Sequence, residues 1–245
     1  MNKGPILVVV AMEVEAKVLL EQITNIEEKT KYGYKFYEGL INNERIVILL
    51  SGVGVINASS SLTIAIAEYK PRLIINYGIA GAMSKNIHTK DIIVGTEVAN
   101  INSYRTGELK EGEGSNPNAW ELLTFLSGQP DKYIEYNSNE ELLKLTKSID
   151  YNNGNIIYGK IGSGDAWNRE VDRILYLNQE YNIICEDMES IALYTISNKF
   201  NIPIISIKII SDNSLIGEEY NRNVGEYLQD YIYKYLNVLI DKKND

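Results

Sequence analysis

Carboxylate side chains follow three apolar runs of this sequence within a few residues. Carboxylates are groups that can hold or transfer protons. The segment 186–190 (Glu-Asp-Met-Glu-Ser) follows a short isoleucine pair, and Ser211-Asp212 follows the run 204–210. Glu15 follows the run 6–10. Because open α/β sheets bind ligands at the carboxyl ends of their strands, we expect these acids to share one site. Paired carboxylates there favour chemistry on a C–N or C–O bond of a sugar.

The composition argues against several other kinds of site. The chain has one histidine, His88, and one cysteine, Cys185. A catalytic Ser-His-Asp or Cys-His arrangement and a histidine-bound metal are therefore poorly supported, and an intrachain disulfide and a Cys-rich zinc cluster are excluded. We expect no metal and no cofactor. The formal net charge is −9 with scattered Lys and Arg, which disfavours a nucleic-acid partner.

Length and hydropathy favour a cytoplasmic globular protein. The 245 residues, 44% of them hydrophobic, suffice for one large α/β domain or two small ones. No run approaches the roughly 18 apolar residues of a membrane span. The start, 1–5, lacks the small-residue cleavage site of a secretory signal. The single cysteine agrees with a reducing cytoplasm.

Strand-like and helix-like segments alternate, which predicts a mainly parallel sheet flanked by helices. We expect strands at 6–10, 73–77, 91–99, 155–161, 183–184 and 204–210, a hairpin at 34–39 and 45–50, and helices at 13–22, 55–69, 169–177, 188–200 and 224–240.

The segment 105–139 interrupts this alternation. It is rich in Gly, Asn, Pro and Glu, with Trp120 and Phe125 embedded, and it is too long for an ordinary connection. Two interpretations stay open: a lid or interface segment, and a surface excursion with its own small apolar anchor.

Three glycine-containing segments, 51–54, 77–82 and 163–167, are predicted to be turns after strands. Glycines let a backbone approach a ligand, and the helix after the first turn would favour anions or polar oxygens at its N-terminus. The first turn lacks the third glycine of a dinucleotide fingerprint. Together the turns predict a shallow pocket lined by backbone; the alternative is three tight turns without a ligand.

Seven short motifs occur in order along nearly the whole chain, and together they resemble the nucleoside phosphorylase and nucleosidase superfamily. They are 11–15 (AMEVE), 51–54 (SGVG), 76–81 (NYGIAG), 91–94 (DIIV), 163–166 (SGDA), 187–189 (DME) and 210–212 (ISD). The branch that the chain resembles is 5'-methylthioadenosine/S-adenosylhomocysteine nucleosidase. The resemblance implies one three-layer α/β domain over 1–245, with a central mixed, mainly parallel twisted sheet flanked by helices and an atypical insertion at about 105–139. It also implies a homodimer that acts on a small nucleoside.

The resemblance also implies roles for individual residues. Glu15 matches the general base that activates a water, and Asp212, supported by Ser211, matches the acid that protonates the purine at N7. Glu189 matches the residue that binds the ribose hydroxyls. The other implied substrate contacts are Met188 beneath the sugar, Trp167 stacked on the purine, Asn168 at the base edge through its backbone, and Met12, Val53, Ala80, Gly81 and Asp187 in the pocket wall.

Four of these side chains also have an ordinary structural explanation that needs no ligand. Glu15 could be a first-turn acid favoured by the helix dipole, and Asp212 the cap of a following turn. Glu189 could lie on a solvated helix face, although the apolar residues beside it favour partial burial. Trp167 could belong to the core.

Hydrolysis is favoured over phosphorolysis, because a phosphate dianion is usually held by arginine. The phosphorylase branch carries arginines in the first turn and beside the central glycine segment, where this chain has 12–15 (MEVE) and 76–79 (NYGI). By the resemblance, Ile79 stands where nucleosidases commonly carry Ser or Thr. Asp187 stands where bacterial members usually have Glu, while plant members look similar to this chain there. A phosphorylase, a hydrolase of another 5'-modified nucleoside such as a futalosine, and a non-catalytic nucleoside-binding protein stay open.

Overall fold

The computed structural model describes residues 4–129 and 131–242; the outermost positions of the predicted domain 1–245 lie outside the described residues. Its strands are β1 (Ile6–Val10), β2 (Thr24–Lys31), β3 (Tyr34–Ile41), β4 (Glu44–Leu50), β5 (Leu73–Ala82), β6 (Ile92–Asn100), β7 (Tyr104–Arg105), β8 (Glu121–Leu122), β9 (Glu135–Asn137), β10 (Ile156–Ser163), β11 (Ile183–Asp187) and β12 (Ile204–Asp212). Its α-helices are α1 (Glu13–Leu20), α2 (Val55–Tyr69), α3 (Glu140–Thr146), α4 (Val171–Tyr181), α5 (Ser190–Lys199) and α6 (Gly225–Asp241), and its 3₁₀ helices are η1 (Pro117–Ala119), η2 (Phe125–Ser127) and η3 (Arg222–Val224).

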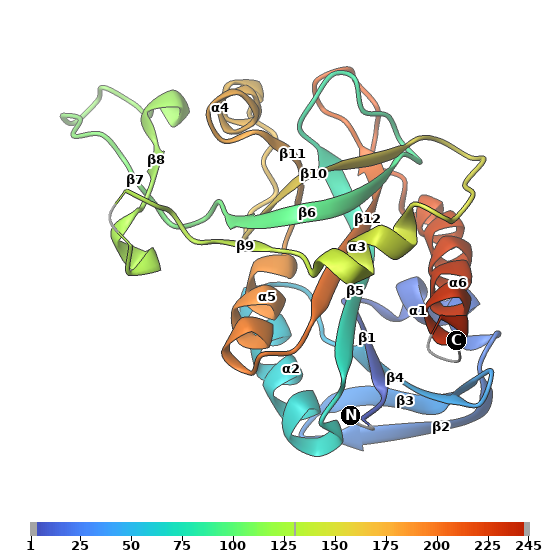
Figure 1. Cartoon of the computed structure of the whole chain (residues 1–245). Helices are drawn as coiled ribbons and strands as arrows, with labels where there is room; N and C mark the ends of the chain where they lie inside the picture. Colours follow the sequence, from blue (N-terminus) through green and yellow to red (C-terminus); the bar gives the residue numbers. More distant parts are fainter. Residues whose placement is uncertain (1–3, 130, 243–245) are drawn as a thin grey trace.

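One mixed sheet forms the centre of the fold, with strand order β11-β10-β6-β12-β5-β1-β4-β3-β2 (Figure 1). Strands β4, β1, β5 and β12 are parallel to one another, and so are β6, β10 and β11. An antiparallel pairing of β12 with β6 joins the two parallel runs. Strand β11 also pairs with β5, so the sheet curls until part of it closes on itself. The predicted mixed α/β sheet is confirmed.

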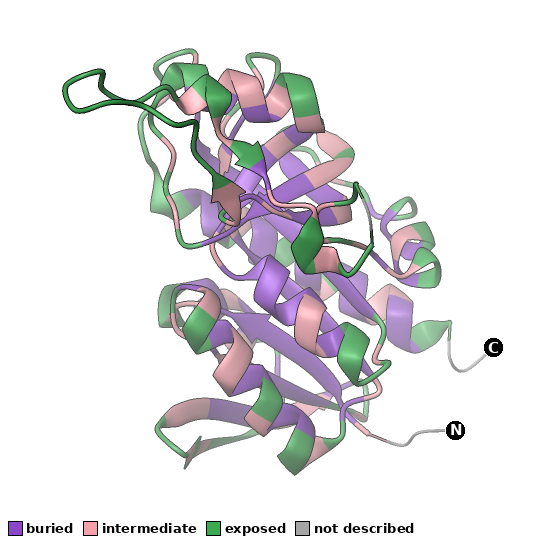
Figure 2. Ribbon diagram, turned by 90° about the vertical axis from the view of Figure 1, so that its left-hand side faces the viewer, coloured by how far each residue is buried: buried purple, intermediate pink, exposed green. Residues whose placement is uncertain are grey.

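Helices cover both faces of this sheet, which gives the three predicted layers (Figure 2). Along β1, Ile6, Val8 and Val10 belong to a core packed against α1, α3 and α6. The alternate residues Leu7 and Val9 belong to a second core packed against α2 and α5. Because successive strand residues point to opposite faces, a strand buried on both faces is apolar throughout, as this one is.

Strand β2 and helix α3 are among the elements that were not predicted, and the prediction of a turn at 77–82 is wrong. Strand β2 is mostly exposed and charged, and α3 has only seven residues, so neither has the apolar pattern of a core element. The segment 77–82 is not a turn, because it continues β5, paired with β12 and then also with β11. The absence of a side chain at Gly78 leaves room for the Glu15 carboxylate, because a Cβ there would lie only 2.7 Å from Glu15 Oε1.

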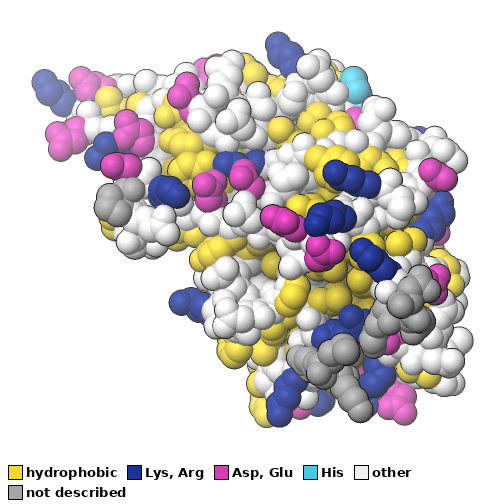
Figure 3. Space-filling view, viewed as in Figure 1, with side chains coloured by type: hydrophobic (Ala, Val, Ile, Leu, Met, Phe, Trp, Pro, Cys, Tyr) yellow, Lys and Arg dark blue, Asp and Glu magenta, His cyan; other side chains and the backbone are white. Residues whose placement is uncertain are grey.

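The part of segment 105–139 around β7 and β8 projects from the body and has its own anchor (Figures 1 and 3), whereas β9 pairs with β6 in the main sheet. Tyr104 and Trp120 stack with their ring centroids 4.9 Å apart. Arg173 of α4 lies over both rings and donates from Nη1 to the Trp120 carbonyl at 2.7 Å. Phe125 is 71% exposed. These contacts match the predicted surface excursion with a small anchor, and they leave the lid or interface interpretation untested.

None of the described helices is both long enough and apolar enough to cross a bilayer.

Candidate active site

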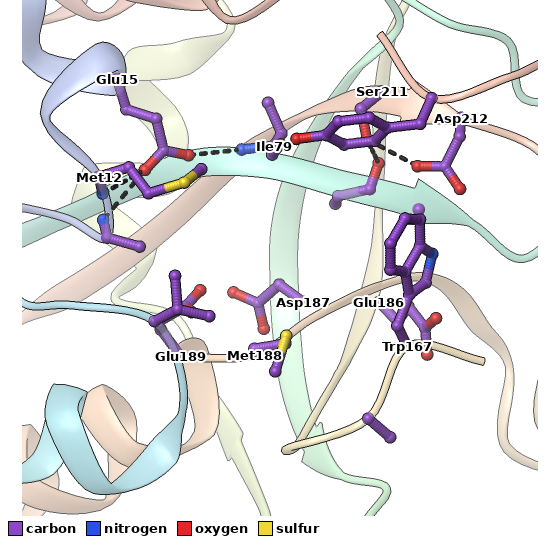
Figure 4. A pocket seen from close by; sticks show the side chains of 16 residues that line it. Met12, Glu15, Ile79, Trp167, Glu186, Asp187, Met188, Glu189, Ser211 and Asp212 are labelled. Atoms are coloured by element: carbon purple, nitrogen blue, oxygen red, sulfur yellow. Dashed lines mark hydrogen bonds between the residues drawn. The ribbon is translucent and has the colours of Figure 1, made fainter. Parts of the chain in front are cut away.

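The strand-end acids meet in one cavity, into which the ends of β5, β11 and β12 and the segments after β1, β4 and β10 project (Figure 4). Of the predicted site residues, those that line it are Met12, Glu15, Val53, Ala80, Gly81, Trp167, Asp187, Met188, Glu189, Ser211 and Asp212. Ala11, Ile79, Ala166, Glu186 and Tyr220 line it as well. Asn168 is not among the lining residues.

Glu15 lies at one end of the cavity, held by backbone amides. It is the third residue of α1, and its Oε2 accepts hydrogen bonds from the N–H groups of Ala11 at 3.1 Å and Met12 at 2.9 Å. Its Oε1 accepts from the Ile79 N–H at 3.1 Å. Burial raises the pKa of Glu15, while the nearby Lys208 charge and these amides act in the opposite direction. The carboxylate is fixed in place and faces the cavity.

Lys208 forms a buried ion pair with Asp187 behind this end of the cavity. Lys208 Nζ lies 2.6 Å from Asp187 Oδ2, and both side chains are 1% exposed. Burial opposes the lysine charge, but Asp187, Glu189 and Glu15 hold the pKa of Lys208 above its usual value. Sequence reasoning missed Lys208; the available signal was a single charged residue inside the apolar run 204–210.

Glu189 faces the same end from the start of α5. Its Oε1 accepts the Gly54 N–H at 2.9 Å, and the residue is 8% exposed, so it does not lie on a solvated face. Gly54 has φ +94° at the N-terminus of α2, a conformation that favours glycine. Burial raises the pKa of Glu189 to about 7, and the neighbouring Asp187 acts in the same direction.

Asp212 lies at the opposite end of the cavity. It ends β12 and is 8% exposed, and its Oδ1 accepts from Ser211 Oγ at 2.7 Å. Trp167 is 55% exposed beside it, with its ring centroid 5.6 Å from that of Tyr220, so Trp167 does not belong to the core. An aromatic wall next to an acid suits a flat heterocycle that takes up a proton.

Glu186 lies at the Asp212 end; it belongs to the acidic segment 186–190 expected at the site, but sequence reasoning gave it no role of its own. Its Oε1 accepts the Asn168 backbone N–H at 2.7 Å, and its Oε2 accepts Asn168 Nδ2 at 2.5 Å. Asn168 therefore has its backbone donor engaged within the protein. Burial raises the pKa of Glu186 to about 7; the Asn168 bonds act against this shift, and the Asp212 charge adds to it.

Within 4–129 and 131–242, no group of three or more His, Cys, Asp or Glu side chains is arranged to hold a metal ion.

Relatives of known name resemble the chain over most of its length. The nucleosidase named 5'-methylthioadenosine/S-adenosylhomocysteine nucleosidase from Staphylococcus haemolyticus (strain JCSC1435) is 29% identical over 210 residues, which cover 82% of this chain and 83% of that protein. The protein of the same name from Anoxybacillus flavithermus (strain DSM 21510 / WK1) is 27% identical over 228 residues, 91% of each chain.

Solved structures share the fold. The 5'-methylthioadenosine/S-adenosylhomocysteine nucleosidase from Neisseria meningitidis, in complex with methylthio-immucillin-A, superposes with a TM-score of 0.78 at 21% identity, covering 95% of this chain and 98% of that one. A futalosine hydrolase mutant of Helicobacter pylori strain 26695 gives 0.76 at 21% identity, covering 98% and 99%.

A sequence model of one family spans nearly all of the chain. The model described as Phosphorylase superfamily matches residues 5–232, which include every side chain of the cavity. The ordered motifs, the curled mixed sheet and this match lead to one conclusion: the chain belongs to the phosphorylase superfamily.

Proposed function

We propose that this protein hydrolyses the N-glycosidic bond of an adenine nucleoside, 5'-methylthioadenosine or S-adenosylhomocysteine, and releases adenine and the free sugar. The observation that carries the proposal is a cavity with a buried, amide-held carboxylate at one end and a second acid beside an aromatic wall at the other. The relatives that cover most of the chain carry nucleosidase names.

The two ends of the cavity supply the two halves of the reaction. Asp212 donates its proton to N7, so the C1'–N9 bond breaks and its electron pair stays on the neutral purine. Positive charge develops at C1', where ionised Glu15 removes a proton from the attacking water. Glu189 accepts hydrogen bonds from the ribose hydroxyls and adds negative charge near C1'.

Water is a better nucleophile than phosphate in this cavity. The described residues that line it include no arginine and no lysine, while Glu15, Asp187 and Glu189 supply negative charge at the sugar end. The buried cation behind it, Lys208, is already paired with Asp187. A phosphate dianion would meet three carboxyl groups with no free cation to bind it.

The proposal is tested by adenine release from 5'-methylthioadenosine with and without phosphate. Equal rates, with free methylthioribose as the sugar product, are expected. Strict dependence on phosphate, with a sugar 1-phosphate as product, would establish the phosphorylase alternative. Tight binding without product would identify a nucleoside-binding protein. S-adenosylhomocysteine and futalosine belong in the same assay, because a futalosine hydrolase shares the fold.

Asp212→Asn is expected to lower kcat/KM for 5'-methylthioadenosine by about 10²- to 10³-fold, because an amide can hydrogen-bond N7 but cannot transfer a proton to it. A 4-nitrophenyl riboside, whose leaving group needs no proton, should lose less than about tenfold. The exposed Asp172→Asn on α4 is the matched control and should stay within about twofold of the unmutated protein. Equal losses on both substrates would remove Asp212 from the acid role.

The activity is expected to fall as the pH drops through about 7. Glu15 and Glu189 act as anions, and burial raises both pKa values, that of Glu189 to about 7. Protonation of Glu189 therefore begins near neutrality, and kcat/KM should decrease about tenfold per pH unit below it, more steeply where Glu15 is protonated as well. A profile of kcat/KM between pH 5 and 8 measures this. A rate that is constant down to pH 5 would contradict the requirement for these two anions.

We also propose a single domain over 1–245, a cytoplasmic location and a homodimer. A lone, buried cysteine suits a reducing compartment. Apolar Val53 and Trp167 line the cavity and are exposed, as a partner surface would require. Sedimentation of the full chain tests the dimer.

A further inference from the structure

Helix α2 begins beside the cavity without a capping group of its own. Its N-cap is Gly54, which has no side chain, and its first turn carries no acidic residue. The first N–H groups of a helix have no partner within the helix, so groups from elsewhere must accept their hydrogen bonds. Val53, which precedes the N-cap, lines the cavity. A group that holds the start of α2 therefore also holds part of the cavity wall.

Two carboxylates from distant segments accept the N–H groups at this helix start. Glu189 Oε1 accepts the Gly54 N–H at 2.9 Å. Asp165 Oδ1 accepts the Val55 N–H at 2.7 Å, although the two residues are 110 positions apart in the sequence. The helix dipole adds to the stability of an anion at this place. The second bond ties the start of α2 to the turn 163–167 that follows β10.

Asp165 makes this contact from outside the cavity. The residue is exposed and is not among the described residues that line the cavity, whereas the next two, Ala166 and Trp167, are. A Cβ on Gly54 would lie 2.8 Å from Asp165 Oδ1, so the carboxylate lies directly against the Gly54 backbone. Because the Val55 N–H belongs to the peptide group that Gly54 begins, its bond to Asp165 also fixes the position of Gly54.

The Gly54 N–H affects Glu189 in two ways. It occupies Oε1, which holds the carboxylate in one orientation on the cavity wall. It also favours the ionised form. Burial and the charges of Asp187 and Glu15 raise the pKa of Glu189 to about 7, while Lys208 and the Gly54 N–H act in the opposite direction. A displaced Gly54 would therefore leave Glu189 both less well oriented and harder to ionise.

We propose that Asp165 is a positioning residue: by holding the start of α2, it keeps the Gly54 N–H on Glu189 and so keeps the Glu189 anion oriented toward the ribose hydroxyls. The proposal rests on the proposed nucleoside hydrolysis, in which Glu189 binds the sugar. Asp165 acts through its acceptor oxygen rather than through its charge. An uncharged acceptor of the same shape should therefore replace it.

The test compares Asp165→Ala with Asp165→Asn, because only asparagine keeps an oxygen that accepts the Val55 N–H. Asp165→Ala should lower kcat/KM for 5'-methylthioadenosine by about tenfold, as expected for a weakened hydrogen bond to a charged group. The midpoint of the acid limb of its pH profile should rise by about half a pH unit, because Glu189 loses a donor that favours its anion. Asp165→Asn should stay within about threefold of the unmutated protein, with no rise in the midpoint. The exposed Asp172→Ala on α4 is the matched control and should stay within about twofold.

The direction of the pH shift separates positioning from a simple charge effect. Removing a nearby negative charge makes a carboxyl group easier to ionise, so the loss of the Asp165 charge alone would lower the midpoint. An unchanged or lower midpoint in Asp165→Ala, or equal losses of activity in the Ala and Asn variants, would overturn the proposal and leave the proposed function standing. Release of no base by the unmutated protein would instead remove the proposed function.

A second measurement needs no turnover. The carboxyl carbon of Glu189 is titrated by NMR in protein labelled at glutamate, with Glu189→Gln to assign the signal and circular dichroism to verify folding. The midpoint is expected at about 7 in the unmutated protein, higher in Asp165→Ala and not higher in Asp165→Asn. Equal midpoints in Asp165→Ala and the unmutated protein would overturn the proposal whether or not a nucleoside is hydrolysed.

Discussion

Replacing Glu15 with Gln is expected to lower kcat/KM for 5'-methylthioadenosine by about 10³- to 10⁴-fold. The amide cannot take a proton from water. It also places an NH₂ group where the carboxylate now accepts from three backbone N–H groups, those of Ala11, Met12 and Ile79. At least one N–H group would face another donor, so the amide would turn away from the geometry that the water requires.

Glu13→Gln is the matched control, because Glu13 lies on the same helix turn with its side chain 66% exposed and outside the cavity. Its kcat/KM should stay within about twofold of the unmutated value. Steady-state kinetics, with circular dichroism to verify folding, make the comparison. A folded Glu15→Gln protein that keeps more than a tenth of the activity would exclude Glu15 as the base.

Replacing Lys208 with Met is expected to lower the free energy of unfolding by about 3–5 kcal/mol. The substitution leaves Asp187 as a buried anion without its cation, and an unpaired buried charge costs more than the pair contributed. Ser190 Oγ, which donates to Asp187 at 2.5 Å, offsets only part of that cost. Equilibrium unfolding in urea at pH 7 measures the change.

Lys144→Met on α3 is the control for this substitution. Lys144 Nζ lies 2.8 Å from Glu141 Oε1, a similar distance, but both side chains are mostly exposed. Solvated pairs contribute little, so this change should leave the free energy of unfolding nearly unchanged. Adding Asp187→Asn to Lys208→Met should recover much of the loss, because it removes the unpaired charge. A cost below 1 kcal/mol for Lys208→Met alone would show that Asp187 needs no cation.

The sequence predicted the parts of the fold that depend on local patterns. Helix α2 has the predicted bounds, 55–69, because its apolar periodicity runs to a stop before Pro71. Strands β1 and β12 were recognisable as largely apolar runs, each preceded by a proline. Strand β2 was not, because an exposed edge strand needs no apolar face, and its charged sequence resembles a loop.

The site was predictable where residue type and strand end were enough, as for Glu15 and Asp212. Lys208 and Glu186 needed knowledge of the tertiary contacts. The lysine inside apolar β12 is explained only by its ion pair with Asp187 of β11, which the sequence of β12 does not show. Glu186 lies beside Asp212 only because β11 also pairs with β5, a pairing between segments about 100 residues apart that no local pattern encodes.

The same closure of β11 onto β5 bears on aggregation. A strand with an unpaired side is a template on which another chain can add a strand. Paired with both β10 and β5, β11 offers little such template. Among the described strands of the main sheet, the remaining edges are β9, with three residues, and β2, which carries Glu27, Glu28, Lys29 and Lys31. A short strand and a charged one are the edges least able to recruit a second molecule.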